Sequence, residues 1–145
     1  MEVAKEIKLG VIVDNLRESS ELFWQEMELV SQIKQVQLII LPLEMKMSTE
    51  RDQMNFHQTL TLQYINSNIL DGLIVLTNTI AIYPSYPLFE NELKKIKHIP
   101  VVSVGTGIEG FPSVLLDNYS GVNEAMDHLV EDHGYRRIAF IKGAK

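Results

Sequence analysis

The chain has 145 residues, of which 46% are hydrophobic and 22% charged, as in a globular domain or one lobe of a larger one. Its net charge of −6 opposes contact with nucleic-acid phosphates, and the absence of cysteine excludes disulfides and thiolate chemistry. No segment approaches the ~20 apolar residues of a membrane span, and the acidic residues near the N-terminus do not suit a signal peptide, so we expect a cytoplasmic protein without membrane contact.

Short runs rich in β-branched residues alternate with amphipathic stretches along the chain. Apolar strands that alternate with helices indicate an α/β protein with a doubly wound, mostly parallel sheet and helices on both faces. In chain order, the prediction is a strand at 8–13, a helix from Ser19 or Ser20, a strand at 36–43, a helix from Thr49 to about Asn66, a strand at 73–77, a helix from Pro87, strands at 101–104 and 114–116, a helix that ends at Gly134, and a strand at 138–141.

The fourth and fifth predicted strands are separated by a short glycine-rich segment. Residues 105–112 are too few for a helical crossover, so an irregular loop is expected to join these strands. The segment reads GTGIEG from Gly105 to Gly110 and matches the dinucleotide fingerprint G-x-G-x-x-G. That fingerprint requires a helix to begin within the glycines, whereas Phe111-Pro112 and a strand follow. We favour a simple loop, and a Rossmann-like nucleotide-binding enzyme is the alternative.

Short polar side chains follow four of the predicted strands. Because the carboxyl ends of parallel strands share one edge of the sheet, these side chains are expected to lie along one rim. A carboxylate beside an amide both accepts and donates hydrogen bonds, which suits the hydroxyls of a sugar or the edge of a nucleobase. The alternative role of each pair is to cap the helix that follows it. The candidate ligand-binding residues are Asp14, Asn15, Thr77, Asn78, Thr106, Asp117 and Asn118.

Residues for catalysis or metal binding do not emerge from the sequence. None of the four histidines, His57, His98, His128 and His133, has metal-ligand spacing to another histidine. No serine has a histidine partner, and no two carboxylates are spaced as acid and base. We therefore expect no catalytic residue, no metal and no cofactor, and we do not expect an enzyme. His133, before Gly134, is expected to interact with a helix dipole.

Five stretches of the chain resemble, in the same order, the ligand-sensing domain of LacI/GalR-type transcriptional regulators. They are KLGVIVDN, LDGLIVLT, HIPVVSVG, SVLLDNYSGVNEAMDHLVEDHG and YRRIAFIKG, and together they cover nearly the whole chain. The stretch from Ser113 to Gly143 is the specific part of the resemblance. The family has the type I periplasmic-binding-protein fold, in which two similar lobes are hinged around a cleft for a small molecule, often a sugar or a nucleobase.

The resemblance implies that residues 1–133 are the N-terminal lobe and that 134–145 hold the first strand of a truncated second lobe. No helix-turn-helix precedes the first strand, so this chain is not expected to contact nucleic acid by itself. The expected function is a small-molecule sensing domain of a cytoplasmic transcriptional regulator, or alternatively of a histidine kinase or diguanylate cyclase. One lobe offers one wall of a cleft, so weak effector binding is expected. The strand at 138–141 would lack neighbours, so we expect it to pair with a second copy, as a homodimer, or to be disordered.

Overall fold

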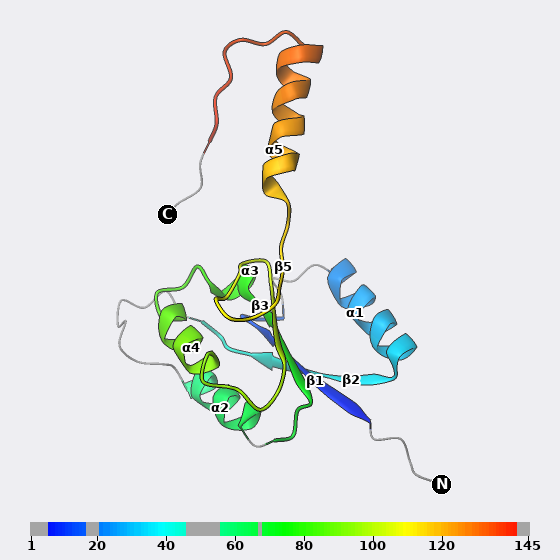
Figure 1. The fold of residues 1–145 in the computed structure, drawn as a ribbon, viewed down its shortest axis with the longest axis vertical. Helices are drawn as coiled ribbons and strands as arrows, with labels where there is room; N and C mark the ends of the chain where they lie inside the picture. The colour runs from blue at the N-terminus through cyan, green and yellow to red at the C-terminus, as the bar shows by residue number, and fades with distance from the viewer. Residues whose placement is uncertain (1–5, 17–20, 46–55, 67, 142–145) are drawn as a thin grey trace. The chain divides into compact units, whose positions relative to one another are not determined.

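The computed structural model describes residues 6–16, 21–45, 56–66 and 68–141 (Figure 1). The predicted helix starts at Ser19 or Ser20 and at Thr49 lie outside the described residues. In chain order the structure has β1 (Ile7–Val13), α1 (Glu21–Lys34), β2 (Val36–Pro42), α2 (Phe56–Ile65), β3 (Gly72–Leu76), α3 (Thr77–Ile80), α4 (Tyr86–Leu93), β4 (Val101–Val104), β5 (Ser113–Val114), α5 (Asn118–Asp127) and the π-helical turn η1 (His128–Asp132).

The chain divides into two compact units, residues 1–115 and residues 116–145, called unit 1 and unit 2. Unit 1 contains all the strands that the described residues form, and unit 2 contains α5 and η1. The predicted division of the chain at residue 133 concerns the two lobes of a longer fold, and it stays a prediction.

The strands of unit 1 form one parallel sheet in the order β2-β1-β3-β4-β5. β1 lies between β2 and β3, with Val11 opposite Ile40 on one side and Ile74 on the other. In unit 1, α1 lies on one face of this sheet and α2 and α4 lie on the other (Figure 1). The predicted fold class, a doubly wound α/β sheet covered on both faces, is confirmed.

The larger core of unit 1 lies between the sheet and helices α2 and α4. Successive residues of a strand point to opposite faces, and Ile12 of β1 and Val75 of β3 point to this one. They meet Ile65 of α2 and Phe89 of α4, and all four side chains are fully buried. Pro87 lies in the first turn of α4, as predicted, because its fixed φ suits that position.

The other face of the sheet is covered by α1 and has a smaller core. Its buried members are Val11, Val13 and Leu76, and partly buried aromatic side chains of α1, Phe23 and Trp24, pack against them. Beside α1 this face bears an apolar groove of about 370 Å³, whose lining includes Met27, Leu73, Ile74, Val102, Val104 and Val114.

An irregular loop joins β4 to β5, as predicted. The predicted strand at 114–116 is displaced, because β5 is Ser113–Val114. Its partner β4 ends at Val104, and Gly105, with a φ of 103°, turns the chain away from the sheet. Leu115 and Leu116 therefore have no ladder partner, and they are exposed.

The described part of unit 2 is a helix followed by a segment without regular secondary structure. Gly134 has a φ of 65°, so the left-handed residue predicted to end this helix is confirmed. The predicted strand at 138–141 is wrong, because residues 135–141 form no strand. An apolar run becomes a strand only where another strand supplies backbone partners, and the described part of unit 2 contains none. The predicted pairing of this segment with a second copy stays a prediction.

Candidate functional site

The candidate site lies at the carboxyl edge of the sheet in unit 1, where β1 and β3 end side by side. β2 lies on one side of β1, and β3 and β4 lie on its other side. The strand order therefore reverses between β1 and β3. In open parallel sheets ligands bind outside the carboxyl ends of the strands at such a point. Asp14 and Asn15 follow β1 directly, and Thr77 and Asn78 follow β3.

Asp14 is buried at this edge, with 2% of its surface exposed. Its carboxylate accepts hydrogen bonds from the backbone N–H of Met45 at 2.6 Å, from the hydroxyl of Tyr83 at 2.7 Å and from the side-chain amide of Asn15 at 3.1 Å. Its own backbone N–H donates to the hydroxyl of Thr79 at 3.3 Å. A buried carboxylate is stable only with such donors, and this one holds together segments that follow β1, β2 and β3. Asp14 is therefore a positioning residue of this edge.

Thr77 is the second buried polar residue of the edge, and it joins β3 to the loop after β4. Its hydroxyl lies 2.8 Å from the carbonyl oxygen of Val104 and 2.7 Å from that of Thr106, and it donates to one of them. The same hydroxyl accepts the backbone N–H of Thr106 at 2.7 Å. This fixes the backbone of Thr106 beside the end of β3.

The close approach between Gly105 and Asn78 completes this corner. A Cβ atom on Gly105 would lie 2.5 Å from the Cβ of Asn78, and the φ of 103° also disfavours any other residue. The first glycine of the GTGIEG segment is thus required by packing against the end of β3. No helix begins within residues 105–112, so the geometry that a dinucleotide fingerprint needs is not formed.

Three of the accessible side chains at this edge are polar and uncharged, and Glu44, whose backbone N–H donates to the carbonyl oxygen of Asp14, adds an exposed carboxylate. The side chains of Asn78 and Thr106 are exposed, and that of Asn15 is half-buried. Amide groups both donate and accept hydrogen bonds, and a hydroxyl does the same. These three side chains suit a small neutral ligand with several hydroxyl or amide groups.

Asp117 and Asn118 belong to unit 2, where Asp117 caps α5. Its carboxylate accepts the backbone N–H of Ser120 at 3.0 Å and the hydroxyl of Ser120 at 2.7 Å. The backbone hydrogen bond first, and the hydroxyl second, hold the pKa of the Asp117 carboxyl below its ordinary value of 3.8. This is the capping role that the sequence offered as an alternative for each pair, and the predicted part of Asp117 and Asn118 in ligand binding stays a prediction.

The contacts that order this edge extend beyond the residues found in the sequence. Tyr83 and Met45 follow β3 and β2 at different distances, and no spacing rule links them to Asp14. The sequence places Tyr83 in a loop at the carboxyl edge, but the hydrogen bond of its hydroxyl to Asp14 could not be predicted from that place. Thr79, in the short helix α3, is the other contact that the sequence did not indicate.

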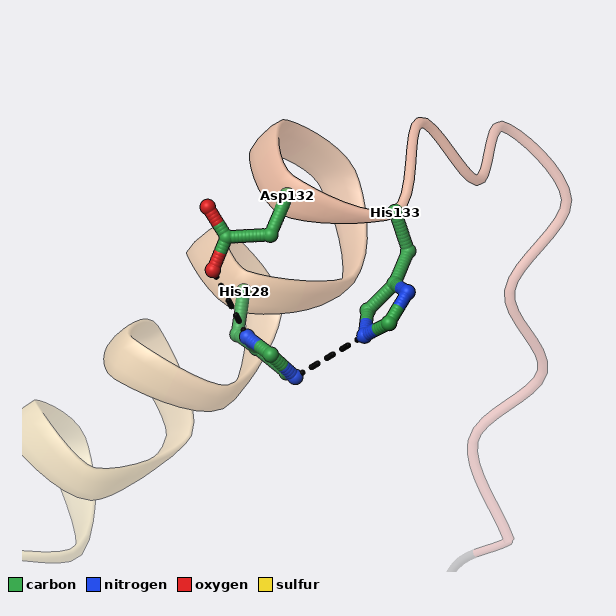
Figure 2. Close-up of polar contacts among 3 residues, drawn as sticks. All are labelled: His128, Asp132 and His133. Carbon is green, nitrogen blue, oxygen red and sulfur yellow. Dashed lines mark hydrogen bonds and ion pairs between the residues drawn. The ribbon is translucent and has the colours of Figure 1, made fainter.

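A polar cluster in unit 2, formed by His128, Asp132 and His133, also escaped the sequence analysis (Figure 2). Among the described residues, no group of three or more His, Cys, Asp or Glu side chains is arranged to hold a metal ion. Of the other histidines, His57 lies 3.2 Å from a carboxylate oxygen of Glu44, and His98 lies 3.3 Å from the carbonyl oxygen of Ile65.

No helix in the described part of the chain is both long and apolar enough to cross a membrane.

No protein-family model, curated protein or solved structure matches this chain. The resemblance to the sensing domains of LacI/GalR-type regulators rests on the five sequence stretches and stays a prediction.

Proposed function

We propose that the carboxyl edge of unit 1 is one wall of a binding site for a small, neutral polar molecule. In this proposal the chain is the sensing lobe of a transcriptional regulator that acts in the cytoplasm and resembles the LacI/GalR type. The observation that carries the proposal is the place of Asn15, Asn78 and Thr106 around the point where the strand order reverses.

The buried contacts beneath these side chains support a binding role because they fix the edge in advance. Asp14 fixes the segments after β1 and β2 by hydrogen bonds, and Thr77 fixes the loop after β4 in the same way. A site that is ordered before the ligand arrives loses less conformational entropy on binding. Asn15, Asn78 and Thr106 bear amides and a hydroxyl, and such groups suit the hydroxyls of a sugar or the edge of a nucleobase.

The weak binding expected of a single lobe follows from the same geometry. Ligand pockets usually bury most of the surface of their ligand, and an open edge of a sheet covers only one side. We expect dissociation constants in the millimolar range for the isolated chain. Nucleic acid is not part of this proposal, because the net charge of −6 repels phosphates.

Nuclear magnetic resonance titration with a panel of monosaccharides and nucleobases tests this function. The expected result is a set of saturable shift changes in the backbone amides of Asn15, Asn78 and Thr106 with at least one compound. Asn78→Ala should weaken this binding severalfold because it removes a donor and an acceptor. Asn91→Ala, at an exposed position of α4, is the matched control and should leave it unchanged.

The proposal fails if saturable shift changes occur only elsewhere in the chain. It also fails if Asn78→Ala and Asn91→Ala bind the compound equally well.

A further inference from the structure

The polar cluster of unit 2 joins two imidazole rings and one carboxylate at the end of a helix (Figure 2). The Nε2 atoms of His128 and His133 lie 3.0 Å apart, and the Nδ1 atom of His128 lies 2.7 Å from a carboxylate oxygen of Asp132. The ring of His133 is stacked on that of Tyr135, with centroids 5.4 Å apart and an angle of 11° between the planes. The orientation of each histidine ring is thus set by a neighbour other than the opposite histidine.

The π-helical turn η1 is what brings the two histidines together. In an α-helix each residue turns by about 100°, so residues five apart point about 140° away from each other. Here the backbone N–H of His133 donates to the carbonyl oxygen of His128 at 3.3 Å, five residues back, which is the bond of a π turn. The wider turn places both rings on one side of the helix end. Such turns occur frequently at functional sites.

We propose that the Nε2 atoms of His128 and His133 bind one divalent copper ion in adjacent coordination positions. Two nitrogens 3.0 Å apart, each at about 2.0–2.1 Å from an ion, subtend an angle of roughly 90–100° at it. The hydrogen bond that sets this separation is lost when an ion binds, so the choice of ion rests on affinity. Cu²⁺ binds nitrogen ligands most tightly among the divalent first-row ions. Water completes the coordination.

Asp132 prepares His128 for this role. A neutral imidazole has one N–H group, and the carboxylate at Nδ1 holds the proton there, so the lone pair of Nε2 is free to bind an ion. Without the ion, His133 donates its Nε2 proton to that lone pair. When the ion binds, the neutral ring of His133 carries its proton on Nδ1 instead, so no net proton is released by this pair. Asp132 is therefore a positioning residue and not a ligand.

Isothermal titration calorimetry of the 145-residue chain with Cu²⁺, Ni²⁺ and Zn²⁺ tests the proposal. We expect one Cu²⁺ site per chain, with Ni²⁺ and Zn²⁺ bound more weakly. His128→Gln and His133→Gln should each weaken Cu²⁺ binding by at least about tenfold, because each removes one of two ligands. Asp132→Ala should weaken it by roughly tenfold, which is the usual effect of losing a carboxylate behind a ligating histidine.

The matched controls are His57→Gln and His98→Gln, which should bind Cu²⁺ as the unaltered chain does. Electron paramagnetic resonance at one Cu²⁺ per chain gives a readout besides affinity, because coupling to two imidazole nitrogens should become coupling to one in His133→Gln. Circular dichroism confirms that each variant keeps its helices. The proposal is wrong if the His128→Gln and His133→Gln variants retain the affinity of the unaltered chain, if no site for one Cu²⁺ is found, or if Zn²⁺ binds more tightly than Cu²⁺.

Discussion

The two units of this chain obtain their structure from different interactions. In unit 1, residues far apart in the sequence meet in a buried core, such as Ile12 with Val75 and Phe89. In unit 2, the described contacts are between near neighbours: Asp117 with Ser120 at the start of α5, and Leu129 with Tyr135 at its end. No residue of α5 or η1 is buried. Burial therefore stabilises unit 1, whereas capping and helical hydrogen bonds maintain unit 2.

The largest expected effect comes from comparing one apolar side chain in each unit. Phe89→Ala should lower the free energy of unfolding by about 4 kcal/mol, because it removes a fully buried ring and leaves a cavity. Val122→Ala, on α5, should change it by less than about 0.5 kcal/mol, since that side chain is 51% exposed. Urea denaturation measures both values. A loss of the same size for Val122→Ala would mean that this face of α5 is covered in solution.

The next largest loss of stability is expected at Asp14, the buried carboxylate of unit 1. Asp14→Ala should destabilise the chain by about 3 kcal/mol, because it leaves the backbone N–H of Met45 and the hydroxyl of Tyr83 without their acceptor. Asp14→Asn keeps one acceptor oxygen and should cost less. Urea denaturation of the two variants side by side checks the order, and equal losses would show that the hydrogen bonds are not the cause.

Substitutions at two glycines of the loop between β4 and β5 distinguish the effect of packing on stability from the effect of backbone strain. Both have a positive φ, but a Cβ on Gly105 would collide with Asn78, whereas a Cβ on Gly110 would meet nothing within 4 Å. Gly105→Ala should cost about 2 kcal/mol, and Gly110→Ala about 1 kcal/mol. Thermal unfolding should show the larger fall in melting temperature for Gly105→Ala. The reverse order would contradict the contact between this loop and the end of β3.

The smallest effect concerns the cap of unit 2 and its dependence on pH. The pKa of Asp117 is lower in the folded chain than its ordinary value of 3.8, so its stabilising contribution is present above that value. The contribution is lost as the pH falls through the lowered pKa, because a protonated carboxyl accepts the N–H of Ser120 less well. A titration of the Ser120 amide shift should report this step below pH 3.8. Asp117→Asn, which caps without titrating, should abolish the step, and a step that persists in this variant belongs to another group.

The fold class could be predicted because each strand is a short apolar run and because proline and glycine mark where helices begin and end between the runs. Pro87 lies in the first turn of α4 and Gly134 ends the helix of unit 2, because the ring of proline fixes φ and glycine accepts a positive φ. The loop from residue 105 to residue 112 could be predicted from its length alone. The polar residues after β1 and β3 were found for the same reason: parallel strands end at one edge.

The features that the sequence did not indicate depend on contacts between distant residues or on unusual backbone turns. Residues 138–141 have the composition of a strand, but a strand also needs a neighbour. The short helix α3 has no helical pattern of its own and forms where Thr77 and Thr79 make hydrogen bonds to other segments. Histidines five residues apart meet only because η1 is a π turn, so standard helical spacing would not bring them together.

The position of β1 between β2 and β3 also determines how the chain is assembled as it is synthesised. β1 is made first, and its second neighbour follows much later, since Ile12 pairs with Val75. At about 5–20 residues per second, roughly 3 to 13 s pass between the synthesis of these two residues. During that time one edge of a highly apolar strand lacks its partner, and nascent chains with such edges aggregate readily. Ribosome-bound chains that stop before β3 should therefore depend on chaperones far more than chains that extend past β4.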